Sequence, residues 1–514
     1  MPSEQHPTIS SSEPVLRPEL GSNTDPASNS EAVAREKTTS GAGSISSTEP
    51  VPARRAGLRH MVWDSIKGTR EDYTSGELSR AVVLLAVPMV LELIMESTFG
   101  LVDLYFVGRL GPDAVAAVGL TESLIILVFG VAMGLSMGTT AMVARRIGEG
   151  DKEGACVAAG QAVLTAVLIA APIGIVGVLL APRLLGWMGA TPAVAQGWPY
   201  TAMLFGGSAT IFLLFLNNAI FRGAGDAAIA MRALWFSNLI NMVLDPCLIF
   251  GWGPFPELGL MGAAVATTIG RGAGVAFQFW MLASHDGRVR IGRRHLRPEW
   301  SVMKRLWRVS ISGMVQFLVA TANWLGIMRI VALFGAPTLA AYTIALRLIH
   351  FAILPSWGMS NAAATLVGQN LGAGKPDRAE RAVWLTGRYN FLFLCGISLV
   401  FWAFAESLIG AFISDPEVIP IGVEVLRILS VAQVTAAYTM VIAQAFNGAG
   451  DTDTPTIINL IVYWLWQLPL AYTLARPLGF GAPGVFTAVL IAGITWAVTG
   501  VVLFRRGRWK EKKI

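Results

Sequence analysis

Three carboxylates lie within one apolar stretch of the chain, at Glu92, Glu96 and Asp103. An ionisable side chain at the centre of a membrane-spanning helix costs about 2.5–3.5 kcal/mol on insertion scales, which makes it a functional candidate by default. At about 100° per residue, Glu96 lies roughly 40° from Glu92, and Asp103 roughly 20° back from Glu96. The three side chains therefore share one stripe of a helix, which should face a cavity or a polar partner rather than lipid.

Further polar residues are expected at the same depth in the membrane as Asp103. At about 1.5 Å per residue, Asp103, Asp245 and Thr267 all fall in the outer half of the membrane. Asn241 precedes Asp245 by one turn on the same face. Two carboxylates, an amide and a hydroxyl would form an oxygen-rich, acidic site that suits a proton or a hard cation such as Na⁺. Arg271, also within a span, would be able to neutralise a carboxylate of span one or of span five.

The composition is that of a protein solvated by lipid. Of 514 residues, 54% are hydrophobic and 14% are charged, whereas a soluble domain carries about 25% charged residues. The net charge of +6 lies in short loops and tails rather than on an amphipathic face with interleaved aromatics, so we expect no nucleic-acid partner. The three cysteines have neither pairing nor metal-ligand spacing.

About twelve apolar stretches are long enough to span a bilayer. Before them, residues 1–55 are too polar to form a core and should be disordered; they do not resemble a secretory signal. Residues 56–79 form an amphipathic, interfacial lead-in that ends in a predicted capping box from Thr74 to Glu77. The predicted spans are 80–107, 115–145, 153–181, 193–221, 228–252, 259–284, 302–334, 338–370, 377–413, 419–446, 455–478 and 482–504.

Lys and Arg gather in the even-numbered loops and at both ends of the chain, a distribution typical of the cytoplasmic side. The sixth loop is the most basic, and the tenth is the one even loop without Lys or Arg. Both termini are therefore predicted to be cytoplasmic. An even number of spans agrees with that prediction.

An internal repeat divides the chain into two related halves. Gly111 aligns with Gly335 at an offset of 335 − 111 = 224, and Phe221–Asp226 aligns with Phe446–Asp451 at an offset of 225. Two parallel six-helix repeats predict an all-α membrane protein whose lobes are related by a pseudo-two-fold axis along the membrane normal, with the substrate path between them. The predicted parts are an N-lobe at 80–285, a basic linker at 286–301, a C-lobe at 302–506 and a basic tail at 507–514.

The same segments resemble the MATE (multidrug and toxic compound extrusion) transporters. The similarity covers about residues 80–506, and each motif is weak alone but specific in order and spacing. The stretches that carry it are 86–90, 100–111, 221–226, 241–246, 258–267, 368–374 and 446–451.

The resemblance implies roles for particular residues. In the DinF-like branch of the family, the residues matching Asp103, Asn241, Asp245 and Thr267 form the N-lobe cation or proton site. A second branch uses acids of spans seven and ten, which here have none in their cores. Coupling is therefore expected in the N-lobe alone.

Four polar residues within the spans are predicted to face the substrate cavity, namely Glu92, Glu96, Asn218 and Gln316. Gln316 takes the place of Glu92 in the second repeat. Glu92 and Glu96 are not part of the family pattern, and structural pairing is the alternative for both.

Because the resemblance places spans two and eight at the lobe interface, Glu122 and Arg347 are predicted to form a gate pair across the outer mouth. The alternative is that each pairs within its own lobe. As for function, we expect an inner-membrane antiporter that exports small organic, cationic or amphipathic compounds in exchange for H⁺ or Na⁺, with membrane lipid around it. We expect it to act as a monomer without a cofactor.

Two other classes remain possible from the residues alone. A lipid-linked precursor flippase would need a strongly basic central cavity, whereas the predicted N-lobe site is acidic. An integral-membrane enzyme would use the paired carboxylates as its catalytic groups. The five histidines form no metal-ligand cluster, and no phosphate-binding loop or nucleophile elbow is found.

Overall fold

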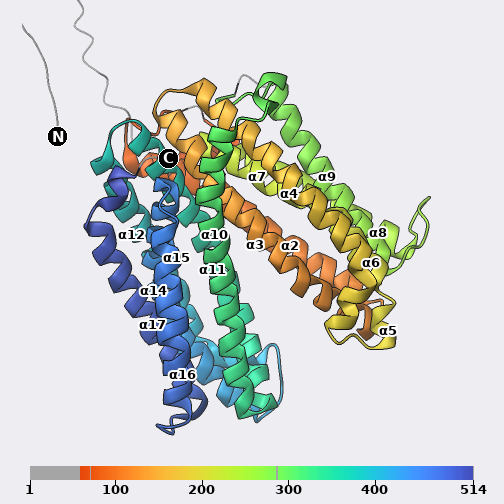
Figure 1. Ribbon diagram of the computed structural model, residues 1–514. Helices are drawn as coiled ribbons and strands as arrows, with labels where there is room; N and C mark the ends of the chain where they lie inside the picture. Colours follow the sequence, from red (N-terminus) through yellow and green to blue (C-terminus); the bar gives the residue numbers. More distant parts are fainter. Residues whose placement is uncertain (1–57, 70, 285–286, 513) are drawn as a thin grey trace, which may run out of the picture. The chain divides into compact units, whose positions relative to one another are not determined.

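The computed structural model describes residues 58–69, 71–284, 287–512 and 514 (Figure 1). Twelve helical spans are found in this part of the chain, as predicted. The predicted disordered segment 1–55 lies outside the described residues. A helix, α1 (Leu58–Lys67), occupies the predicted amphipathic lead-in.

The first six spans form the N-lobe. The fourth span is broken into three pieces, α5 to α7, at Gly197 and Gly207. The helices are α2 (Leu78–Gly108), α3 (Pro112–Gly148), α4 (Lys152–Trp187), α5 (Pro192–Ala195), α6 (Trp198–Gly206), α7 (Ser208–Ala224), α8 (Ala227–Phe250) and α9 (Leu260–Ser284).

The second six spans form the C-lobe. The eleventh span of the chain, which lies in this lobe, is unusual because a π-helical stretch, η3, separates two α-helices. The elements are α10 (Trp300–Val331), α11 (Ala336–Gly372), α12 (Pro376–Ala403), α13 (Ala405–Gly410), α14 (Val418–Ala449), α15 (Asp453–Asn459), η3 (Leu460–Gln467), α16 (Leu468–Ala475) and α17 (Gly481–Arg505). Short 3₁₀ turns lie before α10 (η1, Arg293–Leu296), after it (η2, Ala332–Phe334) and in the C-terminal tail (η4, Arg508–Glu511).

Two local predictions were wrong. The predicted capping box does not form. Thr74 instead donates two hydrogen bonds to the Asp72 carboxylate, one from its backbone amide (2.9 Å) and one from its hydroxyl (2.8 Å). Helix α2 begins after Glu77, which provides no side-chain cap. The predicted ninth span, 377–413, ends at Ala403 instead. Glu406 lies in the first turn of the separate helix α13, where a negative charge is favoured by the helix dipole.

The two lobes meet along a pseudo-symmetric contact between α3 and α11. A Cβ on Gly148 would meet the carbonyl oxygen of Gln369, and one on Gly372 would meet that of Arg145. These contacts are equivalent under the repeat, since 372 − 148 = 224 and 369 − 145 = 224. Glycine is needed at both positions because the helix backbones approach too closely for a side chain.

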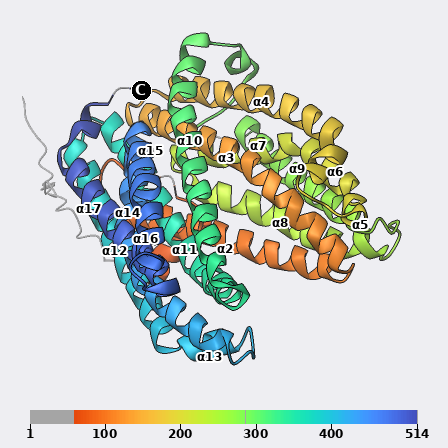
Figure 2. The ribbon, with the colours of Figure 1, turned by 60° about the horizontal axis from the view of Figure 1, so that its bottom comes forward.

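Close contacts between the lobes cluster near the ends of the spans that lie beside the C-terminus (Figures 1 and 2). On α3, Gly134 and Gly138 approach Met314 and Ser310 of α10. On α2, Leu85 and Met89 belong to one buried cluster with Ala362 and Leu366 of α11. Figure 2 shows α3, α4, α7, α8 and α9 grouped on one side and α11, α12, α14 and α17 on the other.

Candidate functional site

The residues of the predicted coupling site lie together in the N-lobe. The Asn241 side-chain amide donates to the Thr267 hydroxyl at 3.1 Å, which links α8 to α9. Asp245, one turn further along α8, is fully buried at 0% exposure. The charge of Asp103 on α2 acts on Asp245.

This cluster contains acceptor atoms that have no donor among the described residues. Both carboxylate oxygens of Asp245, one of Asp103 and the amide oxygen of Asn241 are buried without a hydrogen bond. A buried acceptor without a partner costs about 1–3 kcal/mol, and more when it is charged. Oxygen atoms in this state are suited to a proton or a hard cation, so the donor set fits the expected coupling ion.

Three further side chains interact electrostatically with the acidic cluster. The charges of Glu122 on α3 and Arg271 on α9 both act on Asp103. Arg271 also lies over the ring of Phe129, with 5.8 Å between its guanidinium carbon and the ring centroid. Tyr200 on α6 is 5% exposed and is influenced by all four charges. Tyr200 was not predicted, since a single tyrosine near the start of an apolar span gives no signal in the sequence.

Glu92 lies in a buried network within the N-lobe. Its carboxylate accepts hydrogen bonds from Asn218 at 3.0 Å and from Arg222 at 3.1 Å, both on α7. Gln278 of α9 donates to Asn218 at 2.6 Å and so extends the network to a third helix. The geometry therefore favours the pairing alternative for Glu92. Glu96 follows the same pattern, accepting a hydrogen bond from Asn238 of α8 at 3.1 Å.

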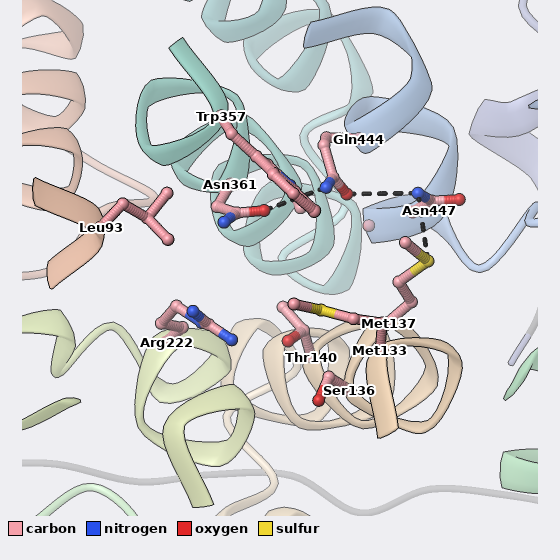
Figure 3. Close-up of a pocket in the computed structure, with 12 residues that line it drawn as sticks. Leu93, Met133, Ser136, Met137, Thr140, Arg222, Trp357, Asn361, Gln444 and Asn447 are labelled. Atoms are coloured by element: carbon pink, nitrogen blue, oxygen red, sulfur yellow. Dashed lines mark hydrogen bonds between the residues drawn. The ribbon is translucent and has the colours of Figure 1, made fainter. Parts of the chain in front are cut away.

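A small pocket of about 60 Å³ lies between the lobes, and we call it the central pocket (Figure 3). In it, Gln444 donates to Asn361 at 3.0 Å, and Asn447 donates to Gln444 at 3.2 Å. Arg222 is its one charged lining residue among the described residues. The lining residues are Leu93, Met133, Ser136, Met137, Thr140, Arg222, Trp357, Asn361, Ala364, Gln444, Asn447 and Gly448.

The central pocket is built from repeat-related positions. Met133 corresponds to Trp357 and Met137 to Asn361, at the offset of 224. Arg222 corresponds to Asn447 at the offset of 225. The pocket therefore lies on the pseudo-two-fold axis, where a parallel repeat is expected to place its substrate path.

The four residues predicted to face the substrate cavity do not line the central pocket. Of the buried network formed by Glu92, Asn218 and Arg222, only Arg222 lines the pocket. Gln316 on α10 is 8% exposed, and its amide oxygen has no partner among the described residues. Glu92, Asn218 and Gln316 are buried between helices, which explains why polarity alone did not locate the pocket.

The predicted gate residues lie on different lobes, Glu122 on α3 and Arg347 on α11. No ion pair joins these two described residues. Within the described chain, no group of three or more His, Cys, Asp or Glu side chains is arranged to hold a metal ion.

Twelve spans folded as two repeat-related lobes place this chain among the multi-pass membrane transporters. A family model described as MatE matches residues 88–247 and 312–473, one match in each half, and the chain belongs to that family. This confirms the resemblance found in the sequence.

Individual relatives agree with the family match. The chain is 27% identical over 444 residues to a probable multidrug resistance protein, NorM, of Thermotoga maritima, covering 85% of this chain and 94% of the relative. It is 26% identical over 439 residues to an FAD transporter of Shewanella oneidensis, covering 85% and 95%. A solved outward-facing structure of a multidrug resistance MATE family transporter matches with a TM-score of 0.80 at 26% identity, covering 86% and 98%.

Proposed function

We propose that this protein is a secondary active exporter in the inner membrane that moves amphipathic, preferentially cationic organic compounds out of the cell in exchange for H⁺ or Na⁺. One observation carries the proposal: the carboxylate of Asp245 is fully buried and has no hydrogen-bond donor among the described residues. A charged group in that state is costly unless a cation neutralises it. Occupancy by a coupling ion therefore changes the energy of the N-lobe by several kcal/mol.

Neutralisation of the acidic cluster would drive the conformational change. The repulsion between Asp103 and Asp245, and the cost of their desolvation, both fall when a cation binds. Helices α2 and α8 can then repack, and each contains a proline, Pro88 and Pro246, at which its backbone hydrogen bonding is interrupted. Because α2 and α3 form much of the contact with the C-lobe, repacking in the N-lobe alters the lobe interface.

The side of opening follows from the predicted topology. Both termini are predicted to be cytoplasmic, and the close lobe contacts lie near the end of the bundle that carries the C-terminus. In this conformation the transporter would be closed toward the cytoplasm. Ion binding from outside would then alternate with opening toward the cytoplasm. The membrane potential would add about 2.3 kcal/mol per charge per 100 mV to the driving force for ion entry.

A second candidate is export of anionic compounds, and Arg222 at the wall of the central pocket favours it. The FAD transporter among the relatives carries an anionic molecule by its name. Against this candidate, the Arg222 guanidinium is paired with Glu92 at 3.1 Å, so its charge is largely balanced. The carboxyl groups of Glu96, Asp103 and Glu122 make the N-lobe attract cationic rather than anionic compounds.

The test is transport in proteoliposomes with separately imposed proton and sodium gradients, comparing a cationic and an anionic fluorescent substrate. We expect Asp103→Asn and Asp245→Asn to abolish the response to the driving gradient. Asp113→Asn is the matched control, because Asp113 is exposed in the first turn of α3. Undiminished gradient-driven efflux after both cluster acids are neutralised would overturn the proposal.

A further inference from the structure

A second cavity, of about 460 Å³, lies between the last two spans and away from the central pocket. We call it the α15–α17 groove. None of its lining residues lines the central pocket. Its lining residues are Phe446, Asp451, Thr454, Ile457, Ile458, Ile461, Val462, Trp466, Thr495, Thr499, Leu503, Arg506, Arg508 and Trp509.

Most of the groove wall is apolar and open to the surroundings of the bundle. Ile457, Ile461 and Trp466 are 55%, 51% and 45% exposed. These residues lie along a membrane span, so their surroundings are acyl chains. Ile461 and Trp466 belong to the π-helical stretch η3, and π-helical insertions are frequent at functional sites. The wall therefore offers a long apolar surface to a hydrocarbon chain.

One end of the groove is basic. Arg506 and Arg508 follow the last turn of α17, are exposed, and have guanidinium groups that form no hydrogen bond or ion pair with the described residues. The carboxylate at this end, that of Asp451, does not neutralise the two arginines. It forms an ion pair with Lys512 at 3.0 Å and accepts a hydrogen bond from the Thr454 hydroxyl at 2.7 Å. Two guanidinium groups without acid partners thus face the mouth of an apolar groove.

The position of these arginines matches the membrane surface. Helix α17 has 25 residues, which is about 37 Å at 1.5 Å per residue and so crosses a bilayer core of about 30 Å. Residues directly after its end lie at the level of lipid headgroups. Guanidinium groups bind phosphate oxygens in a planar, two-point geometry, and basic pockets between spans on the cytoplasmic side bind anionic headgroups.

We propose that the α15–α17 groove binds an anionic phospholipid, with its phosphate on Arg506 and Arg508 and one acyl chain along the wall formed by α15, η3 and α17. The apolar length of the groove selects a lipid over a soluble phosphate. The unpaired arginines select an anionic headgroup over a zwitterionic one. The site is separate from the central pocket and from the N-lobe acids, since it shares no lining residue with the pocket and contains none of those acids.

The test is native mass spectrometry of the purified full-length protein in detergent, titrated with phosphatidylglycerol or phosphatidylethanolamine. We expect phosphatidylglycerol to bind at least about tenfold more tightly, and the double variant Arg506→Gln/Arg508→Gln to lose that preference. The matched control is Arg505→Gln, because Arg505 lies over the ring of Trp384 at 5.6 Å and outside the groove. It should retain wild-type lipid binding.

A second variant separates loss of the site from loss of folding. Thr499→Phe fills the groove and leaves both arginines in place, so we expect it to weaken phosphatidylglycerol binding while the protein stays monodisperse. A large excess of glycerol phosphate should not displace the lipid. The proposal is overturned by equal lipid binding in the double variant and Arg505→Gln, by equal affinity for the two lipids, or by displacement with glycerol phosphate.

Discussion

The guanidinium of Arg145, near the end of α3 in the N-lobe, donates a hydrogen bond to the backbone carbonyl of Lys512 in the C-terminal tail. The Lys512 side chain is in turn paired with Asp451 at 3.0 Å and Asp453 at 3.7 Å in the C-lobe. The tail therefore ties the two lobes together at the end of the bundle where the close helix contacts lie.

The segment before α2 forms a second tie at the same end. The Tyr73 hydroxyl donates to the carbonyl of Gly225 in the N-lobe at 3.3 Å. From the C-lobe, Arg378 donates to the carbonyl of Ser75 at 2.6 Å, and Lys375 donates to that of Thr74 at 2.8 Å. Both ties must break or stretch when the lobes separate at this end.

Removing the Arg145 tie should favour opening at this end. Hydrogen bonds to charged groups contribute about 1.5–3 kcal/mol, so we expect Arg145→Gln to raise the open population roughly tenfold. The measurement is the rate at which a cysteine at Ser310, fully buried beside Gly138, reacts with a thiol reagent in a background without the three native cysteines.

Arg146→Gln is the control for this prediction. Arg146 is the neighbouring arginine, and its partners Glu149 and Asp151 belong to the same lobe. It should leave the labelling rate at the wild-type value. Equal rates in the two variants would show that the tail does not hold the lobes together.

The buried pair of Glu92 and Arg222 should matter mainly for stability. Breaking one partner of a buried ion pair costs about 3–5 kcal/mol, because the other charge is left uncompensated. We expect Glu92→Gln to lower the thermal unfolding temperature in detergent clearly, and the double variant Glu92→Gln/Arg222→Gln to be less destabilised than the sum of the single changes. Additive losses would mean that the two charges are not coupled.

The hydroxyl of Thr267 should support ion coupling through Asn241. Thr267→Val keeps the shape of the side chain but removes the acceptor for the Asn241 amide, which is otherwise satisfied at 3.1 Å. We expect the apparent affinity for the coupling ion in proteoliposomes to fall roughly tenfold. Thr268→Val is the control, since the Thr268 hydroxyl bonds only the carbonyl of Ala264 within its own helix at 2.8 Å. Wild-type ion affinity in Thr267→Val would exclude a role for this hydroxyl.

The global fold was predictable because the bilayer imposes simple rules on the chain. Each span needs a long apolar run, and the repeated glycines at one offset revealed the two lobes. The predicted positions of Asp103, Asn241, Asp245 and Thr267 also agree with their gathering in the N-lobe, since buried polar residues stand out in apolar helices. Local features set by competing short-range contacts, such as the Asp72–Thr74 turn, did not stand out.

The central pocket was harder to predict for a physical reason. Met133, Trp357 and Asn361 are ordinary residues of membrane helices, and only the shape of the lobe interface brings them together. The repeat did contain a signal, because Arg222 and Asn447 are the single mismatch between the otherwise identical hexapeptides. Both of these residues line the pocket.

The last prediction concerns Glu122 and Arg347. In the present conformation the lobes are in contact near the C-terminal end of the bundle, and these two residues lie toward the other end of α3 and α11 without an ion pair between them. Glu122 and Arg347 would therefore form a gate only when the lobes close at that other end of the bundle. Single charge reversals should therefore slow transport, each by roughly tenfold, by destabilising the closed mouth.

The charge-swapped variant Glu122→Arg/Arg347→Glu distinguishes a gate from pairing within each lobe. The rescue must be judged against Glu122→Arg, because the charge of Glu122 also acts on Asp103, and its reversal disturbs the coupling site equally in that variant and in the swap. If the two side chains meet during the cycle, the swap restores transport above the level of Glu122→Arg. A cysteine pair at the same two positions should then form a disulfide only under conditions that close this end. Transport in the swap no better than in the single reversal would place each charge with partners in its own lobe.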